Sequence, residues 1–475
     1  MSAMATLAMK TKSKTRKRVT KKRSSKPAGG LRSYSTAMRF LGTFTDYERM
    51  TRVGYNHTTF NLSRMQKILS AVNRPHRKFK SIHIAGTKGK GSCAHMLANM
   101  LQACDYKVGL YTSPHLVDMR ERIVVNGKII DESDFLRLLN KLVPVLKNFD
   151  DKSRPTFFEI ITAIGFMYFA EQEVDIAIIE TGLGGRLDST NVIKPEVCAI
   201  TAIGYDHTYQ LGSSLTSIAE EKAGIFKAGV PVISVPQAPE VKKVLTKSAK
   251  SVKAPIKFTG DDIDFSYRFE SSRITGPHTR ICLTTDLSKY EHLPVPLPGE
   301  HQAINCGLVL AVIDVLKAKG WEIEDDKALE GLSCTRLPGR MEIVCNDPRV
   351  LIDGAHNPAS IEALIRTIGQ HINYDSMVVI FGCAADKDIN GMLEYVAMGA
   401  DKVIFTQSNS VRSADPEELA IKFEERTGRM AQWARTLPEA LRIANSVVTP
   451  GDLICVTGSF YLAGEAKRFF MENRQ

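Results

Sequence analysis

The chain has 475 residues, a length typical of two or three domains. Apolar residues make up 43% of it and charged residues 24%, which is ordinary for a soluble globular protein. No run of 18 consecutive apolar residues occurs, so the sequence offers no membrane-spanning helix. The net charge of +11 comes almost entirely from one end of the chain, which argues against a basic nucleic-acid-binding surface over the rest.

That basic end is residues 1–30, which hold ten Lys or Arg residues and no acidic residue. The remaining residues include 53 basic and 52 acidic side chains, a net charge of +1. We expect residues 1–35 to form a disordered basic tail, because this composition cannot build a core. The tail could be a polyanion-binding arm, an incidental solvated segment, or an organellar transit peptide, although it favours Lys and lacks a clear amphipathic face.

The nine cysteines are odd in number and include no C-x-x-C pair. A disulfide framework or a structural zinc site is therefore not expected, and a reducing compartment is the simpler inference. We predict a cytoplasmic protein, with an organellar location as the alternative if the tail is a transit peptide.

The first predicted elements are a buried strand at 79–85 and a helix in which Ala94, Leu97 and Leu101 recur at helical spacing. The seven residues between them contain three glycines and two lysines. A glycine-rich turn before a helix N-terminus favours an anion, and Lys90 adds a point charge suited to nucleotide phosphates. The strict Walker pattern is not met, because Ile84 and Gly91 replace the glycine and the Ser or Thr that it requires. The competing interpretation is a solvent-exposed turn. The predicted phosphate-binding residues are Gly86, Thr87, Lys88, Gly89, Lys90, Gly91 and Ser92.

Strands and helices then alternate along the chain, which predicts α/β domains with parallel, doubly wound sheets that bind ligands at the strands' carboxyl ends. Residues 257–297 break this alternation with short alternating runs and are predicted to be a small β-rich insertion. A Pro-Gly pair at 338–339 suggests an interdomain linker. The predicted strands after the first are 107–111, 175–179, 197–203, 230–235, 350–352, 377–381, 402–406 and 453–457, and the predicted helices include 156–170, 217–222 and 301–316.

An acid and a histidine near strand ends suggest metal chemistry. Glu180 ends a hydrophobic strand, as a carboxylate does when it meets Mg²⁺ beside phosphates, although a helix-capping or surface role is as plausible for the residue alone. The glycine-rich loop 181–188 behind it strengthens the metal interpretation. His207, judged by its local sequence, is more typical of a structural histidine.

Eight motifs stand in an order that resembles one family, the folylpolyglutamate synthase / dihydrofolate synthase family of the Mur-ligase superfamily. They cover essentially the whole chain from about residue 40 onward, apart from the tail. The motifs are Gly86-Thr-Lys-Gly-Lys-Gly-Ser92, Tyr111-Thr-Ser-Pro-His115, Glu121-Arg-Ile123, Glu180-Thr-Gly-Leu-Gly-Gly-Arg-Leu-Asp-Ser-Thr-Asn191, Asp206-His-Thr208, Glu221-Lys-Ala-Gly-Ile225, Leu337-Pro-Gly-Arg340 and Asp353-Gly-Ala-His-Asn-Pro358.

The resemblance implies a P-loop ATPase domain like the Mur-ligase central domain at 36–335, a linker at 336–341, and a smaller Rossmann-like α/β domain at 342–475. It implies an ATP-dependent ligase that adds L-glutamate to a folate, and also to dihydropteroate, through an acyl phosphate. The implied cofactors are ATP, two Mg²⁺ ions and a monovalent cation. A monomer without membrane or specific nucleic-acid partners is expected.

The resemblance also assigns individual residues. Lys90, Lys222 and His207 would be catalytic, and Lys222 would be carbamylated to hold a second magnesium; without the resemblance it would be an ordinary helix-surface lysine. For Phe158 and Asp188, core packing and loop capping are the competing roles. The implied metal ligands are Ser113, Glu180, His207 and Lys222; the further nucleotide contacts are Asn305, Arg340, Asp353 and His356; the substrate contacts are Phe158, Asp188 and Arg122.

Two positions depart from the family pattern. Lys88 stands where many members carry Asn, and an added cation there should not impair ATP binding. Ser189 replaces the Ala of some bifunctional members, which leaves dihydrofolate synthesis less firmly implied than folate polyglutamylation.

Two other functions compete with this one. A cell-wall ligase acting on a UDP-sugar peptide, from the same superfamily, would need a separate N-terminal domain of about 100 residues, and only some 80 residues precede the phosphate loop. A nucleic-acid-binding protein acting through the basic tail would be expected to interleave aromatic residues with its cations, and this tail does not.

We predict that deleting residues 1–30 leaves ligase kinetics unchanged, because the tail has no core-forming residues and the rest of the chain is nearly neutral. Retention on heparin should fall on the same deletion and weaken steeply with salt. Steady-state kinetics of the truncated protein test this, and a large fall in kcat would place the tail in the active site.

Overall fold

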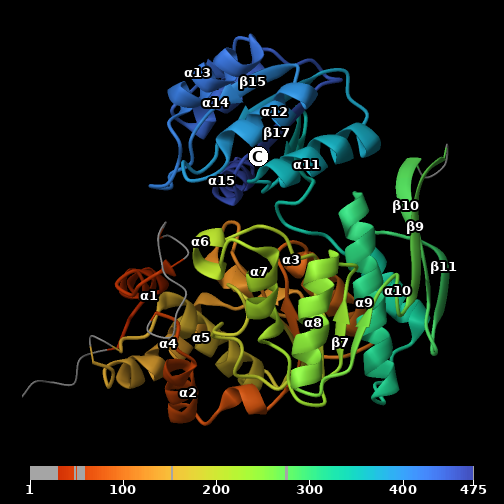
Figure 1. The fold of residues 1–475 in the computed structure, drawn as a ribbon. Helices are drawn as coiled ribbons and strands as arrows, with labels where there is room; N and C mark the ends of the chain where they lie inside the picture. The colour runs from red at the N-terminus through yellow and green to blue at the C-terminus, as the bar shows by residue number, and fades with distance from the viewer. Residues whose placement is uncertain (1–29, 48–49, 51–58, 151–152, 273–275, 474–475) are drawn as a thin grey trace, which may run out of the picture.

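The computed structural model describes residues 30–47, 50, 59–150, 153–272 and 276–473. Most of the predicted tail therefore lies outside the described residues, and α1 (Tyr34–Leu41) begins within the range assigned to it, capped by the Ser33 side chain. The rest of the chain forms a larger lower part and a smaller upper part (Figure 1).

The lower part is built on an eight-stranded sheet in the order β4-β3-β2-β5-β1-β6-β7-β8. Six neighbouring strands are parallel, whereas β3 and β4 run antiparallel at one edge, which the predicted alternation did not include. The chain leaves β1 toward β2 and β5 on one side and later fills β6 to β8 on the other, so β1 marks a switch point of the topology. The strands are β1 (Lys80–Ala85), β2 (Val108–Tyr111), β3 (Ile123–Val125), β4 (Lys128–Ile129), β5 (Ile176–Glu180), β6 (Val197–Ile200), β7 (Val232–Ser234) and β8 (Ile256–Phe258).

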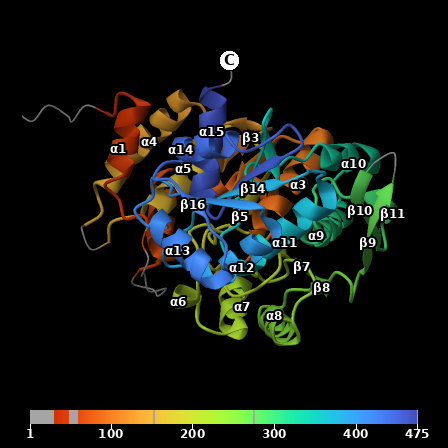
Figure 2. The same cartoon turned by 90° about the horizontal axis from the view of Figure 1, so that it is seen from above.

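Helices cover both faces of this sheet (Figures 1 and 2). Alternate residues of β5 point to opposite faces: Ile176 and Ile178 join the core under α3, α9 and α10, while Ala177 and Ile179 join the core under α1, α2, α4 and α5. The helices are α2 (Leu62–Ala71), α3 (Lys90–Ala103), α4 (Glu132–Leu146), α5 (Phe157–Glu171), α6 (Thr208–Leu211), α7 (Leu215–Ala223), α8 (Pro239–Ser251), α9 (Glu300–Ala318) and α10 (Asp325–Ser333), with short 3₁₀ turns η2 (Pro75–Arg77) and η3 (Met119–Arg122).

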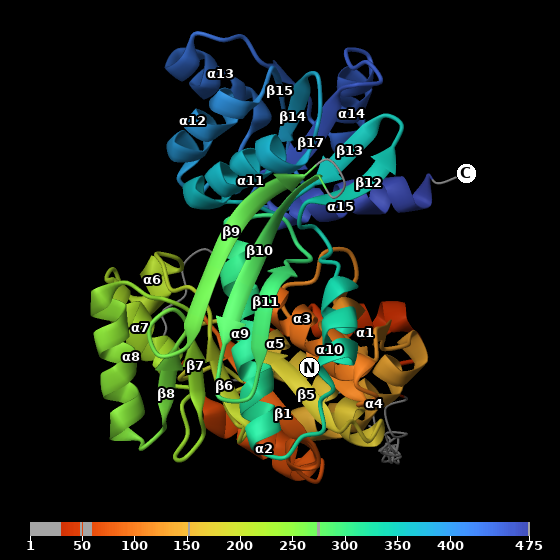
Figure 3. The same ribbon diagram turned by 90° about the vertical axis from the view of Figure 1, so that its right-hand side faces the viewer.

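The predicted β-rich insertion is confirmed as a three-stranded antiparallel sheet, β9 (Asp264–Ser272), β10 (Gly276–Thr284) and β11 (Lys289–Pro294), in the order β11-β10-β9. It stands beside α9 and reaches up to α11 (Pro358–His371) of the upper part (Figure 3). There the ring of Phe269 meets His371 edge-on at 5.4 Å between centroids, and His371 Nδ1 lies 3.2 Å from the Pro277 carbonyl oxygen.

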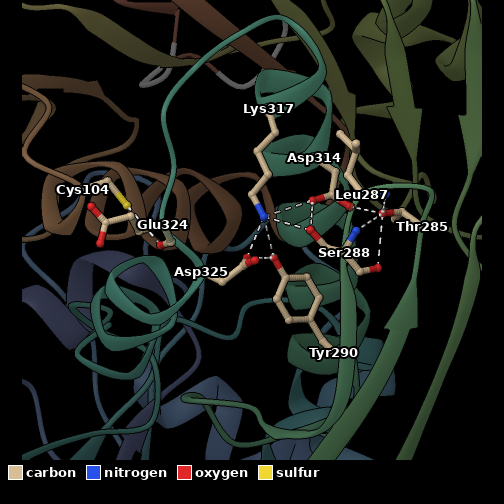
Figure 4. Close-up of polar contacts among 9 residues, drawn as sticks. All are labelled: Cys104, Thr285, Leu287, Ser288, Tyr290, Asp314, Lys317, Glu324 and Asp325. Carbon is tan, nitrogen blue, oxygen red and sulfur yellow. Dashed lines mark hydrogen bonds and ion pairs between the residues drawn. The ribbon is translucent and has the colours of Figure 1, made fainter.

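A polar network fastens this small sheet to α9 and α10 (Figure 4). Asp314 of α9 accepts hydrogen bonds from Ser288 Oγ, at 2.6 Å, and from Thr285 Oγ1. Lys317 Nζ donates to Ser288 Oγ at 2.8 Å and to Asp325 Oδ1 at 2.6 Å, and lies 3.7 Å from Asp314. Asp314 and Lys317 are both largely buried, so the network compensates their charges: Lys317 and two hydroxyl groups face Asp314, and Asp325 and Asp314 face Lys317.

The upper part is a six-stranded sheet in the order β12-β13-β17-β14-β15-β16, parallel except for the edge strand β12. Helices α11 to α13 pack on one face, and α14 and α15 on the other. Its strands are β12 (Glu342–Asn346), β13 (Arg349–Ile352), β14 (Met377–Phe381), β15 (Lys402–Phe405), β16 (Gln432–Trp433) and β17 (Leu453–Thr457), and its remaining helices are α12 (Ile389–Gly399), α13 (Pro416–Thr427), α14 (Leu437–Asn445) and α15 (Phe460–Glu472).

The two parts touch where the loop after β2 meets α15. Arg468 donates to the Val117 carbonyl oxygen at 2.8 Å, and a Cβ atom at Gly464 would lie 2.0 Å from the Leu116 carbonyl oxygen. This close packing brings the loop that carries Ser113 next to the upper part.

Over the part of the chain that the structure describes, α9 alone is long and apolar enough to span a membrane by length and composition. In the structure, 72% of the most apolar 18-residue segment of α9 is buried inside the protein, where the helix packs against one face of the eight-stranded sheet.

We predict that Asp314→Ala lowers the free energy of unfolding by about 2 kcal/mol, because it removes the acceptor of the Ser288 and Thr285 hydroxyl groups and one of the two carboxylates that face Lys317. Urea denaturation measures the change. The control is Asp286→Ala in the same β10–β11 turn, where the side chain is 97% exposed and little change is expected. Equal effects of the two variants would contradict a stabilising network.

Candidate functional site

The glycine-rich turn lies at the carboxyl end of β1, where neighbouring chain approaches it closely. A Cβ atom at Gly86 would lie 1.8 Å from Thr201 Oγ1, and one at Gly89 would lie 2.3 Å from Asn305 Oδ1. Both glycines have positive φ, 150° at Gly86 and 91° at Gly89. No other residue fits either position without moving its neighbours, so the turn depends on these two glycines.

Hydrogen bonds to the segment after β6 hold the turn in place. The Ala202 carbonyl oxygen accepts from the N–H groups of Thr87, at 2.9 Å, and Lys88, at 3.2 Å. The Thr87 hydroxyl lies 3.1 Å from both the N–H and the carbonyl oxygen of Gly204. The predicted phosphate-binding turn is therefore held by hydrogen bonds to the segment that follows β6.

Lys90 is the first residue of α3, so its charge adds to the positive end of the helix. Its Nζ lies 3.4 Å from the Thr87 carbonyl oxygen and 4.0 Å from Glu180 Oε1. The predicted pairing of a loop lysine with the acid that ends β5 is thus present in the structure.

Glu180 is the last residue of β5 and its carboxylate is almost completely buried. Its Oε2 accepts a hydrogen bond from the Ser113 N–H at 3.1 Å. Burial raises the pKa of Glu180 to about 7, with Lys90 opposing the shift. A buried carboxylate with so little positive compensation is suited to a cation.

The donors around Glu180 fit a magnesium ion better than a transition metal. Among the described residues, no group of three or more His, Cys, Asp or Glu side chains could hold a metal by itself. Mg²⁺ typically takes one or two protein oxygens and completes its shell with water and phosphate. Glu180 and Ser113 beside a phosphate-binding turn match that pattern.

Lys222 points inward from α7 instead of lying on the helix surface. Only 5% of the residue is exposed, and its Nζ donates to the Gly86 carbonyl oxygen at 2.7 Å. Burial, and next the nearby charge of Lys90, lower the pKa of Lys222 to about 7. The surface-lysine interpretation of the sequence is therefore wrong, and Lys222 lies directly beneath the phosphate-binding turn.

His207 precedes α6 in a left-handed conformation, with φ of 49°. Its side chain is 51% exposed within the cleft, and its Nε2 lies 3.9 Å from Asp206 Oδ2. Among the described residues, Asp206 is the charged partner nearest to this ring, and His207 lines the cleft.

The upper part contributes the other predicted nucleotide contacts. Asp353 accepts hydrogen bonds from the N–H groups of Met341, at 3.0 Å, and Ala355, at 2.8 Å, and burial raises its pKa. Arg340 stacks 5.3 Å above the Phe460 ring and lies 3.9 Å from Asp353. These residues, His356 and, from α9, Asn305 face the same cleft as the turn.

The three predicted substrate contacts have different surroundings. Phe158 lines the cleft and packs against Gly182, where a Cβ atom would lie 2.5 Å from its ring. Asp188 also lines the cleft, but its oxygens cap its own loop. Arg122 is 1% exposed, donates to His115 and is not among the residues that line the cleft, although its charge lies near enough to Glu180 to oppose the rise in the pKa of that carboxylate.

A cleft of about 1350 Å³ between the two parts joins the predicted site residues except Gly86, Lys222 and Arg122, which do not line it. It also contains residues that sequence analysis missed: Asp386, Lys387 and Arg412 from the upper part, and the largely exposed Tyr205 and Tyr209 from the segment around α6. The first three follow the carboxyl ends of β14 and β15, so the strand-end rule used for the first sheet could have found them.

Comparison with known proteins identifies the chain. Residues 84–313 match the Mur ligase middle domain, and residues 339–460 match the Mur ligase, glutamate ligase domain. The dihydrofolate synthase/folylpolyglutamate synthase of Bacillus subtilis is 33% identical over 411 residues, which cover 86% of this chain and 94% of that protein. The chain belongs to the folylpolyglutamate synthase / dihydrofolate synthase family. A Mycobacterium tuberculosis relative of the same name is 33% identical over 447 residues, covering 87% of this chain and 91% of its own.

Solved structures of this family share the fold. Mycobacterium tuberculosis folylpolyglutamate synthase, complexed with ADP, superposes with a TM-score of 0.82 at 31% identity, covering 93% of this chain and 98% of that one. E. coli FolC, in complex with DHPP and ADP, gives a TM-score of 0.78 at 27% identity, covering 94% and 99%.

Proposed function

We propose that the protein is an ATP-dependent ligase that joins L-glutamate to a carboxyl group of a folate, and also to dihydropteroate. The observation that carries the proposal is the cleft in which a phosphate-binding turn, a buried strand-end carboxylate and groups from the second sheet face one another. Family membership supports it, since relatives named for both activities span nearly the whole chain.

The reaction begins with transfer of the γ-phosphoryl group of ATP to a substrate carboxylate, which gives an acyl phosphate and ADP. The amine of glutamate then attacks the acyl carbon, the C–O bond to phosphate breaks, and the amine loses a proton as the amide forms. Carboxylate and triphosphate repel each other, so cationic groups must hold them together. The N–H groups of residues 86–92 and the charge of Lys90 supply that stabilisation.

Arg340, Asp353 and His356 would hold the nucleotide from the upper part, and Asn305 from α9. The Asn305 amide donates to Gln302 at 3.1 Å and packs against Gly89, which fixes its orientation. Because Arg340 and the glycine-rich turn both line the cleft between the two parts, a bound triphosphate would contact both.

Glu180, Ser113 and His207 would hold magnesium, with Lys222 near a second ion. Bound magnesium would neutralise phosphate charge and polarise the transferring group. For Lys222 to become an anionic ligand, its neutral amine must attack carbon dioxide, forming an N–C bond and releasing one proton. Its deep burial against Gly86 disfavours the cationic amine and is compatible with this modification.

Phe158 would pack against the pterin ring, and Asp188 would shape the loop beside it. We propose a cytoplasmic reaction, because the cysteines lie unpaired among the described residues. An organellar site remains the alternative if residues 1–30 are a transit peptide.

The test is an ADP-release assay with L-glutamate in which tetrahydrofolate and dihydropteroate are offered separately. Glutamate-dependent ADP release should appear with each acceptor. If neither acceptor supports ADP release, the proposed function is contradicted.

Lys90→Ala should lower the rate of ADP release about 10²- to 10³-fold, the usual cost of losing one fixed group that stabilises developing charge. The matched control is Lys78→Ala, an exposed lysine outside the cleft, which should keep the parent rate.

For Lys222, we predict that Lys222→Ala and Lys222→Arg both lose most activity while remaining folded by circular dichroism. Acetate or formate should partly restore Lys222→Ala, because a small carboxylate can fill the position of the carbamate, and should not restore Lys222→Arg. A carbamate signal in ¹³C NMR with labelled bicarbonate should be present in the parent and absent in both variants. Full activity of both variants would return Lys222 to a structural role.

A further inference from the structure

One buried histidine beside the cleft has no part in the reaction described above. His83 lies in the middle of β1, paired with both β5 and β6, and has no exposed surface. Its Nε2 lies 2.9 Å from Thr190 Oγ1, whereas its Nδ1 is buried without a hydrogen-bond partner among the residues that the structure describes. Buried polar groups are usually paired, so this arrangement requires a reason.

The hydrogen bonds around Thr190 fix the tautomer of the ring. The Thr190 hydroxyl donates its only proton to Asp188 Oδ1, because a carboxylate can only accept. The Thr190 hydroxyl oxygen must then accept a hydrogen bond from His83 Nε2–H. The proton of the neutral ring is therefore on Nε2, and Nδ1 is unprotonated. Burial, with a contribution from the charge of Lys227, lowers the pKa of His83 to about 3, so the ring is neutral.

The hydrogen bonds that start at His83 end at Asp188, whose carboxylate accepts four hydrogen bonds. Its Oδ1 accepts from the Thr190 hydroxyl and, at 3.0 Å, from the Thr190 N–H. Its Oδ2 accepts from the N–H groups of Gly182 and Leu183, each at 2.9 Å. Asp188 therefore closes the loop 181–190 on itself.

That closed loop forms one wall of the cleft. Gly182, Leu183, Leu187 and Ser189 line it together with Asp188. The Phe158 ring packs against Gly182, so the position of the loop backbone also sets the position of this ring.

We propose that His83 and Thr190 are positioning residues, which orient Asp188 and thereby hold the loop 181–190 in the shape that receives the pterin end of the substrate. The identity of that substrate rests on the proposed function. The phosphate-binding turn is held by other contacts, through Ala202 and Gly204, so nucleotide binding does not depend on this chain of hydrogen bonds.

The test compares Thr190→Val, which keeps the shape and removes the hydroxyl, with Thr190→Ser, which keeps the hydroxyl. In Thr190→Val, the dissociation constant for dihydropteroate, measured by calorimetry with ADP present, should rise about tenfold, the effect of losing one hydrogen bond to a charged group. The dissociation constant for ADP should stay at the parent value, and Thr190→Ser should restore dihydropteroate binding.

The matched control is Thr259→Val, at a fully buried threonine outside the cleft whose hydroxyl lies 3.5 Å from the Ser234 carbonyl oxygen. This control should lose some thermal stability and keep both dissociation constants. Unchanged dihydropteroate binding in Thr190→Val, or equal weakening of dihydropteroate and ADP, would overturn the positioning role.

A second readout does not need the substrate. Hydrogen exchange at the Gly182 and Leu183 amides should be faster in Thr190→Val and in His83→Leu than in the parent or in Thr259→Val, because their acceptor loses its orientation. Unchanged exchange would refute the proposal. If instead the parent binds no dihydropteroate while exchange responds as expected, the proposed function fails and the positioning role stands.

Discussion

The site depends on one crowded contact, the approach of three chain segments to Gly86. The Thr201 side chain occupies the space where a Cβ atom of residue 86 would lie, and Lys222 donates to the Gly86 carbonyl oxygen at 2.7 Å. β1, the end of β6 and α7 are thereby locked together at the switch point of the sheet. Any larger residue at position 86 would separate the turn from the lysine beneath it.

Burial around this contact sets the charges of the site. Glu180 and Lys222 are both removed from solvent, which raises the pKa of the acid and lowers that of the amine, each to about 7. The charge of Lys90 lowers both pKa values, because it favours the ionised carboxylate of Glu180 and disfavours a second ammonium at Lys222. At neutral pH, Glu180 and Lys222 therefore carry less charge than their residue types suggest, an electrostatic setting suited to an anion that binds together with cations.

Two sets of contacts hold the loop that follows Glu180. Asp188 caps the loop with help from Thr190. Arg186 pairs with Glu221 at 2.8 Å, and the Arg186 N–H donates to the Glu221 carbonyl oxygen at 2.7 Å, one residue before Lys222. The wall proposed to receive the pterin is thus packed against the helix that carries Lys222, the lysine that contacts the glycine-rich turn at Gly86.

The sequence by itself determined the strand, turn and helix at 80–103, the principal parallel strands, the small β insertion and the family, since each rests on local periodicity or on an ordered set of motifs. It did not reveal the antiparallel edges, the helices with weaker patterns such as α8, or the inward direction of Lys222, whose neighbours in sequence suggest a surface. Only the tertiary structure decided that Arg122 is buried against His115 instead of lining the cleft, and that the oxygens of Asp188 accept hydrogen bonds from its own loop. Burial and hydrogen-bond saturation depend on residues distant in the chain: His83 and Thr190 are 107 positions apart, and only folding brings them to 2.9 Å.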